Sequence, residues 1–191
     1  MDKIALKGFC AARTWPITVN STTVYSTGTM IPLSGAQNLT KEVSRSEYTI
    51  YADDAVYDSG SDYQYEDLTF TIAGLPLEIE AKLAGGTYSE TEKTYVFKSA
   101  DVAPEFAFAY AALRSDGQYR MFKHYCVRLM SVKVDHATKG EANEIAAYTL
   151  TFRSTQRAAD GAVRIEKDST DKTYTWLDTI DQIAETGGGE G

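Results

Sequence analysis

The sequence predicts a mainly β protein, an antiparallel β-sandwich or partial barrel with one short flanking α-helix at about residues 75–84 and a long loop at about residues 49–66. Three observations predict this class: apolar and polar residues alternate in several segments, turn-forming residues separate those segments, and one segment has helical spacing. The length of 191 residues and the hydrophobic share of 43% suit one domain with a sizeable core. We assign residues 1–186 to this domain and residues 187–191 to a flexible glycine-rich tail.

Strand-like alternation begins in the first half of the chain, at residues 46–52 and 68–72. In the second of these segments Leu68, Phe70 and Ile72 lie on one face and threonines lie on the other, which is typical of a half-buried strand. Four later segments also have strand character: residues 119–135, 146–154, 162–167 and 172–176.

Two short turns, at residues 115–117 and 160–161, contain Asp followed by Gly, a pair that is common in hairpin connections. The first turn predicts a hairpin between residues 106–114 and 118–121, and the second predicts a hairpin between residues 149–157 and the strand that follows. Antiparallel hairpins are therefore the expected building unit, and a sandwich or barrel is their natural closure.

Residues 75–86 depart from the strand pattern and predict a short helix. Pro76 suits the first turn, and Gly85 suits the C-terminal stop. Glu78 and Lys82 have the i,i+4 spacing of a helical ion pair. An apolar stripe repeats every four residues and consists of Leu75, Ile79 and Leu83. We expect this helix to pack on a β body.

The chain is acidic, with a formal net charge of −8 and a pI of about 4.8. Binding of nucleic acid needs clustered Lys and Arg, so we expect no specific nucleic-acid site, although an acidic surface can enclose DNA without adhering to it. The N-terminal residues lack a secretory signature, and no segment approaches the roughly 20 apolar residues of a membrane helix. We expect no membrane contact, and we expect Cys10 and Cys126 to be buried free thiols in a reducing cytoplasm.

The sequence motifs do not point to catalysis or to a bound metal. His124 and His136 have no Cys or His at zinc-ligand spacing, and the chain contains no nucleophile elbow or phosphate-binding glycine loop. Cys126 and His124 share one face of a predicted strand, but residues i and i+2 lie about 6.6 Å apart. We therefore predict that the protein is not an enzyme, uses no cofactor and has no catalytic or metal-binding residue.

The predicted loop at about 49–66 mixes acidic residues with tyrosines. The acids of this region are Asp53, Asp54, Asp58, Asp62, Glu66 and Asp67. Such carboxylates can hold calcium, but their spacing does not match an EF-hand. Two other interpretations are a solvated loop between strands and a partner-binding loop. Exposed tyrosines are costly without a contact, which gives the partner-binding interpretation at least equal weight.

The order of these segments resembles that of the siphophage major tail protein family. Members of this family form the tail tubes of long-tailed bacteriophages. The resemblance lies in residues 51–54, 67–76, 83–86, 103–110, 115–120, 137–141 and 148–152, and it spans about residues 8–176. Each motif alone is common among β proteins, and their succession carries the likeness. Many members of the family have an extra immunoglobulin-like domain after the tube domain, which we do not expect here.

This resemblance implies a subunit that forms hexameric rings, which stack into a tube whose lumen carries DNA during ejection without binding it specifically. It implies a location in the virion tail after synthesis in the host cytoplasm. The implied partners are further copies of the chain, the tape measure protein and the tail tip or terminator proteins. It also implies that residues 49–66 reach the adjacent ring. The predicted contact residues are Tyr51, Asp53, Asp54, Tyr57, Tyr63 and Tyr65.

Two alternatives stay open at the level of sequence. The first is another ring-forming component of a phage tail or head, such as a terminator or a decoration protein, or a tube subunit of an injection system. The second is a carbohydrate- or calcium-binding β-sandwich, which needs an exposed aromatic platform or a carboxylate cage. Stacking of rings separates a tube protein from a terminator, and calcium-dependent melting reveals a carboxylate cage.

Overall fold

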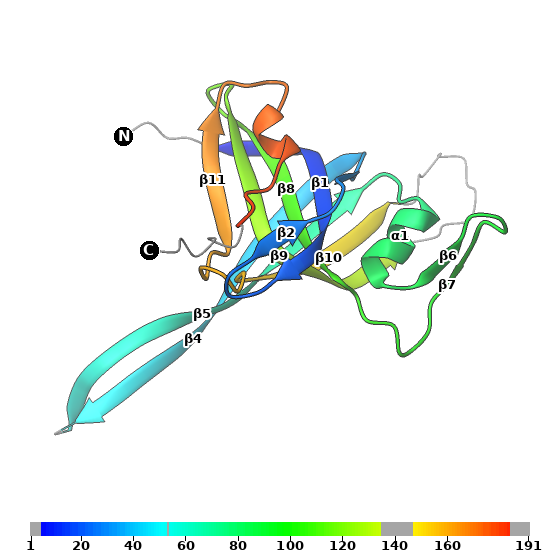
Figure 1. Cartoon of the computed structure of the whole chain (residues 1–191). Helices are drawn as coiled ribbons and strands as arrows, with labels where there is room; N and C mark the ends of the chain where they lie inside the picture. Colours follow the sequence, from blue (N-terminus) through cyan, green and yellow to red (C-terminus); the bar gives the residue numbers. More distant parts are fainter. Residues whose placement is uncertain (1–4, 53, 135–146, 184–191) are drawn as a thin grey trace, which may run out of the picture.

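The computed structural model describes residues 5–52, 54–134 and 147–183, and it is mainly β, as predicted (Figure 1). Within these ranges nine strands form one antiparallel sheet, in which seven follow the order β2-β1-β8-β9-β10-β5-β4, while β3 pairs with β1 and β11 pairs with β9. The bounds of the nine strands are β1 (Leu6–Asn20), β2 (Tyr25–Thr27), β3 (Ile31–Pro32), β4 (Ala36–Ala52), β5 (Ala55–Ile72), β8 (Glu105–Arg114), β9 (Tyr119–Val134), β10 (Tyr148–Thr155) and β11 (Arg164–Ser169). A separate small hairpin consists of β6 (Thr87–Ser89) and β7 (Thr94–Val96).

The large sheet curls around a hydrophobic core without closing into a barrel, which agrees with the predicted partial barrel. The rings of Phe9 on β1 and Phe70 on β5 lie 5.9 Å apart, although three other strands separate β1 from β5 in the sheet. Such a contact requires a strongly curved sheet. Phe70 also stacks on Phe108 and meets Phe152 edge-on, with both centroid distances at 5.1 Å. These three strands, β5, β8 and β10, therefore share one aromatic centre of packing.

A second apolar cluster covers the opposite face of β8 and β9. It includes Trp15, Tyr25, Met121, Tyr125, Leu177 and Ile180. The C-terminal segment supplies part of this cover through the 3₁₀ helix η1 (Thr175–Asp178). The strand predicted at residues 172–176 is therefore wrong. The Asp171 carboxylate accepts hydrogen bonds from the backbone N–H groups of Thr173 and Thr175, and such local bonds favour a turn over a strand.

The predicted helix is confirmed as α1 (Leu77–Ala84). Glu78 Oε1 and Lys82 Nζ form the expected ion pair at 2.5 Å. Gly85 ends the helix with a φ of 79°, which favours glycine. A Cβ atom at this position would also lie 2.2 Å from the Val102 carbonyl oxygen. The apolar stripe packs as predicted, since Leu83 is fully buried in the core.

The long loop predicted at residues 49–66 is instead a continuation of two paired strands. β4 and β5 pair from Ala36 opposite Ile72 to Ala52 opposite Ala55, so the whole stretch forms one long hairpin. Asp, Ser and Gly are common in loops, and their density here hid the strand signal. The backbones of β4 and β5 pair along the whole hairpin, because the ends of both strands that pack on the core fix the register.

The hairpin predicted across residues 160–161 is also corrected. β10 and β11 do not pair with each other, and both pair with β9 instead, one after the other along the same edge. The connecting loop is tight, because the Arg157 N–H donates to the Ala162 carbonyl and the Gly161 N–H donates to the Arg157 carbonyl. The turn chemistry was therefore right, and the strand pairing was wrong. The hairpin across residues 115–117 is confirmed between β8 and β9.

Some predictions concern residues outside the described ranges: Asp53, His136, the segment 137–141 and the tail 187–191. Cys10 and Cys126 are free thiols, as predicted; Cys126 is buried, but Cys10 is only partly buried, so the predicted burial is confirmed for Cys126 alone. Among the described helices, none has the length and apolar character needed to cross a membrane.

Candidate assembly interface

The outer part of the β4–β5 hairpin projects from the body (Figure 1). We call residues 44–63 the ribbon. Within the described part of the chain, β5 pairs with β10 only from Glu66 to Ile72, and no strand pairs with the outer edge of β4. Both outer edges of the ribbon therefore present backbone N–H and C=O groups that lack a strand partner. At about 3.3 Å per residue the ribbon reaches about 30 Å from its root.

The ribbon exposes large side chains that a lone hairpin cannot bury. Tyr51 and Tyr57 are 72% and 77% exposed, and Val56 and Ile50 are 58% and 50% exposed. A two-stranded hairpin without a third strand or a packed face is marginally stable in water. Exposed apolar surface on a projecting element is typical of a site that meets a partner. The ribbon therefore has the composition of an interaction element.

One cross-strand pair explains how the ribbon holds its strand form despite its glycine. Tyr48 stands opposite Gly60 in the register. A Cβ atom on Gly60 would lie 2.6 Å from the Tyr48 hydroxyl oxygen, so the tyrosine ring covers the glycine backbone. Aromatic cover of this kind compensates for the missing side chain of a strand glycine.

Of the six predicted contact residues, the five that the structure describes divide between the tip and the root of the ribbon. Tyr51, Asp54 and Tyr57 lie exposed at the tip. Tyr63 and Tyr65 lie near the root and are partly buried. The Tyr63 hydroxyl donates to the Ser154 carbonyl at 3.0 Å, and the guanidinium of Arg153 lies 3.7 Å from the centre of the Tyr65 ring. Both root tyrosines thus have contacts within their own subunit that fix where the ribbon leaves the body.

A buried polar cluster lies at the root of the ribbon. It consists of Glu66 on β5, His124 on β9, Ser154 on β10 and Arg164 on β11. The Glu66 side chain is fully buried and forms an ion pair with Arg164, whose side chain is 31% exposed. A buried carboxylate is stable only with a counter-charge, so this pair ties β5 to β11. The sequence predicts an acidic loop around Glu66, and no sequence pattern indicates this pairing with Arg164.

The cluster superficially contains the residue types of a catalytic triad. His124 Nδ1 lies 3.2 Å from Ser154 Oγ and 3.5 Å from Glu66 Oε2, so both groups contact the same ring nitrogen. A catalytic relay instead places the hydroxyl and the carboxylate on opposite nitrogens. All three side chains are fully buried. Burial also raises the pKa of the Cys126 thiol to about 11, which keeps it protonated at neutral pH.

The His124 ring titrates far from its usual range. Burial lowers its pKa to about 3, and the Lys41 ammonium nearby acts in the same direction, while the Glu166 carboxylate acts against both. The negative charge of Glu66 is already matched by Arg164. His124 is therefore neutral in the folded protein at any pH above about 4, and its Nδ1 shares a hydrogen bond with Ser154 Oγ, while the Glu66 carboxylate lies 3.5 Å away.

We expect the free energy of unfolding to fall as the pH drops from 7.5 to 5.0, because the unfolded chain protonates His124 near pH 6.5 and the folded protein does not. The stability that comes from keeping His124 neutral is fully present above the unfolded pKa and is lost as the pH falls toward 3. Between pH 7.5 and pH 5.0 the expected loss in the free energy of unfolding is about 2 kcal/mol. Urea unfolding of the native protein and of a His124→Gln variant at both pH values measures it. A difference between pH values that is equal in the two proteins would contradict this assignment.

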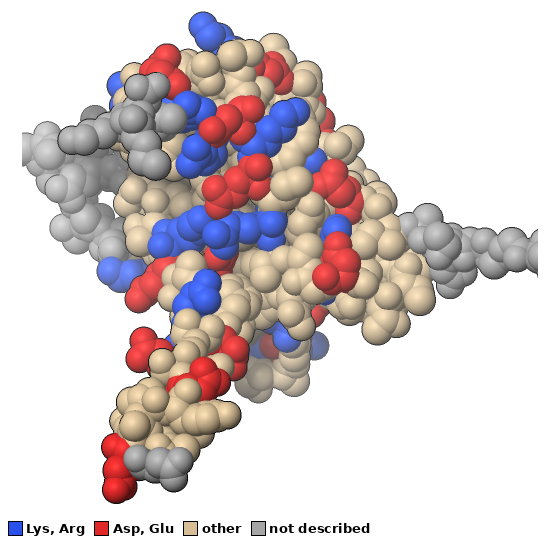
Figure 2. Space-filling model, turned by 90° about the vertical axis from the view of Figure 1, so that its left-hand side faces the viewer, with Lys and Arg blue, Asp and Glu red and all other residues tan. Residues whose placement is uncertain are grey.

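Charge is distributed unevenly between the ribbon and the body. In sequence the stretch 45–63 has five acidic residues and one basic residue. Figure 2 shows acidic residues toward the end of the ribbon and many Lys and Arg on the body above it, mixed with further acids. Several cations of the body belong to ion pairs: Lys41 with Glu166, Arg120 with Asp168, and Arg153 with Asp67. The ribbon is thus an acidic element on a body of mixed charge.

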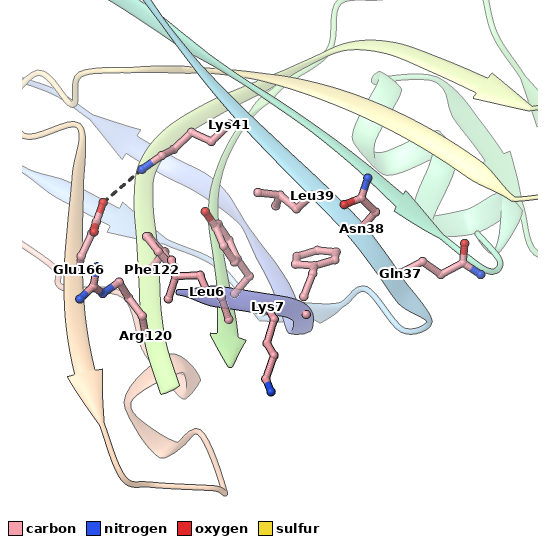
Figure 3. Close-up of a pocket in the computed structure, with 13 residues that line it drawn as sticks. Leu6, Lys7, Gln37, Asn38, Leu39, Lys41, Arg120, Phe122 and Glu166 are labelled. Carbon is pink, nitrogen blue, oxygen red and sulfur yellow. Dashed lines mark hydrogen bonds and ion pairs between the residues drawn. The ribbon is translucent and has the colours of Figure 1, made fainter. Parts of the chain in front are cut away.

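A pocket of about 460 Å³ lies where the curled sheet fails to close, between β1 and β4 (Figure 3). Its floor is aromatic, with Tyr110 and Phe122 stacked at a centroid distance of 4.7 Å. Lys7, Lys41 and Arg120 line it together with one acid, Glu166. We call this the edge pocket. The only sequence signal for it is the cationic side chains scattered among apolar residues, which does not predict a shared site.

The described residues contain no group of three or more His, Cys, Asp or Glu side chains arranged to hold a metal ion. Asp58 and Asp62 lie on a paired strand rather than in a loop that could fold around an ion. The acidic residues of the ribbon are therefore better placed for contact with a cationic surface than for chelation.

No family model matches the chain, and no curated protein matches it in sequence. Three solved structures show some likeness in shape. A chain of the anti-feeding prophage baseplate has a TM-score of 0.43 and 8% identity, covering 87% of this chain and 97% of that chain. A chain of the anti-feeding prophage tube-terminating cap has a TM-score of 0.42 and 10% identity over 83% and 89%. A chain of an extracellular contractile injection system, from the PVC sheath-tube complex, has a TM-score of 0.41 and 12% identity over 80% and 91%. At such values the likeness is weak, and it assigns no family.

Proposed function

We propose that this protein is a structural subunit of a bacteriophage-type tail tube, in which hexameric rings stack around a channel for DNA. The observation that carries the proposal is the ribbon, a long β-hairpin that exposes Tyr51, Val56 and Tyr57 without any cover from its own subunit. A soluble monomer gains nothing from such an element. A repeating assembly gains a contact with each neighbour, because a projecting element and a separate receiving surface form a heterologous interface.

Two further features support the proposal. The outer edge of β4 is unpaired along the described length of the strand, and exposed strand edges are a hazard that joining subunits removes. The order of the sequence motifs resembles that of the siphophage major tail proteins. The hexameric ring is proposed from this resemblance, and so are the partners, which are the tape measure protein and the tail tip or terminator proteins. An acidic chain also suits a channel through which DNA slides without adhering. The proposed role needs no cofactor and no catalysis.

The test is negative-stain electron microscopy of the purified protein over a wide range of concentration, combined with sedimentation velocity. We expect sixfold rings or hollow tubes whose fraction rises with concentration. Addition of a tail tip or a preformed tube fragment as a nucleus is included, since assembly of such subunits can wait for an initiator. A protein that stays monomeric at every concentration, with and without the nucleus, would contradict the proposal.

The same images separate a tube subunit from a ring-forming component that does not stack. Closed rings that never stack favour a terminator or another ring-forming head or tail component. Stacked rings are also expected of a tube subunit from an injection system, so these images do not separate that role from a phage tail tube.

A further inference from the structure

We infer that the tip of the ribbon of one copy inserts into the edge pocket of the next copy, so that the opening between β1 and β4 is the receptor for the ribbon. This inference rests on the proposed assembly and adds to it by naming the surface that receives the ribbon. Four independent features of the described residues favour the match: shape, apolar content, charge and unpaired backbone.

The pocket offers an apolar floor of a size that suits the side chains at the tip. Its volume of about 460 Å³ is lined by Leu6, Phe9, Leu39, Tyr110 and Phe122, among others. The tip presents two tyrosines and Val56, all more than half exposed. Burial of such side chains favours association, provided that a complementary apolar surface receives them. An aromatic floor also favours stacking with an inserted tyrosine ring.

The rim of the pocket has the charge that an acidic ribbon needs. Lys7 is exposed, and Figure 3 shows Lys41 and Arg120 apart from it, on the side of the pocket where Glu166 lies. Lys41 and Arg120 also pair with Glu166 and Asp168, so Lys7 is the cation best placed for an incoming carboxylate. Asp54 lies at the very tip of the ribbon, next to the side chains that would enter the pocket.

The backbone at the pocket also suits a strand. β1 pairs with β8 on one side, while its other side is paired only from Ala12 onward, through Leu33, β3 and β2. The described segment Leu6–Ala11 therefore has one edge without a strand partner, and the outer edge of β4 faces the same opening. Two irregularities in the β1–β8 register, around Cys10, interrupt the pairing beside this opening, and such bulges bend a strand. An inserted ribbon can add backbone hydrogen bonds to these edges.

Charge favours the edge pocket over a second pocket in the described structure. This pocket, of about 420 Å³, lies beside β7 and β9 and is also partly apolar, with Phe97 and Met130 in its lining. Its charged lining residues are Glu80 and Asp101, and it has no Lys or Arg. An acidic ribbon would meet like charges there, which disfavours that arrangement.

Site-specific photo-crosslinking in the full-length protein tests the inference. p-Benzoylphenylalanine replaces Tyr57, assemblies are irradiated, and mass spectrometry identifies the linked peptides. We expect intermolecular links to residues 6–9 and 37–41. The same group in place of Phe97 serves as the matched control and should give no link to those segments. Links from position 57 to residues 95–103 or 129–132, or to any surface outside the edge pocket, would overturn the inference while leaving the proposed assembly intact.

A charge-reversal pair gives an independent readout. Lys7→Glu is expected to raise the concentration needed for polymerisation about tenfold, and Lys98→Glu, an exposed lysine near the second pocket, should change it less than twofold. Circular dichroism confirms that both variants fold. Equal effects of the two variants would overturn the inference. If the native protein forms no oligomer, the proposed function fails together with the inference. If the native protein polymerises but the two variants have equal effects, only the inference fails.

Discussion

Replacement of residues 47–61 by a two-residue Asn-Gly turn is expected to give a folded monomer that no longer polymerises. Ser46 and Asp62 stand opposite each other in the β4–β5 register, so a short turn can join them without strain. The removed side chains have little burial in their own subunit, and the free energy of unfolding should change by no more than about 1 kcal/mol. Sedimentation velocity measures the loss of assembly, and thermal melting measures the retained fold.

The matched control for this variant is a similar cut in the other exposed hairpin. Residues 90–93 connect β6 and β7, and Ser89 stands opposite Thr94, so the same Asn-Gly turn fits there. The control should still polymerise. Tubes of normal appearance from the ribbon-trimmed protein would contradict the role of the ribbon, and a trimmed protein that does not fold would show that the ribbon stabilises its own subunit.

Arg164→Ala is expected to destabilise the protein by about 3 kcal/mol, because it leaves the fully buried Glu66 carboxylate without its counter-charge. Glu66→Gln should cost less, about 1 kcal/mol, since Arg164 is partly exposed and keeps a second partner in Glu166 at 2.8 Å. Chemical denaturation of the two single variants and of the double variant measures these differences. The double variant should be more stable than Arg164→Ala alone, which is the signature of a coupled pair.

Arg120→Ala provides the control for the buried pair. Arg120 forms a two-pronged ion pair with Asp168, but both side chains are partly exposed to solvent, at 31% and 39%. Surface pairs of this kind contribute at most about 1 kcal/mol. An equal loss of stability in Arg120→Ala and Arg164→Ala would show that burial of Glu66 carries no special cost.

The sequence was most informative where the local signal and the tertiary environment agree. Leu68, Phe70 and Ile72 alternate with threonines, and all three are buried in the core. The helix at Leu77–Ala84 has its proline start and its glycine stop within the segment itself. In both places the deciding forces act between residues a few positions apart, so a single sequence contains the needed information.

The candidate site was predicted only in part. The tyrosines and acids of residues 49–66 predict a partner-binding stretch, and its exposed tip, with Tyr51 and Tyr57, keeps that interpretation as a prediction. Glu66 looked like one more acid of a loop, because nothing in the sequence indicates that Arg164, almost a hundred residues away, lies beside it. Lys7 and Arg120 come together in the edge pocket for the same long-range reason.

The sequence by itself determined the strand-rich class, the capped helix, the free thiols and the acidic balance, since composition and short-range periodicity set each of these. Only the tertiary structure decided that β1 pairs with β8, that β10 and β11 share one edge of β9, and that the presumed loop is a projecting ribbon. The physical reason is that strand pairing joins residues far apart in the chain. Which edges meet depends on how the whole core packs, and the burial of Glu66 and His124 follows from that packing.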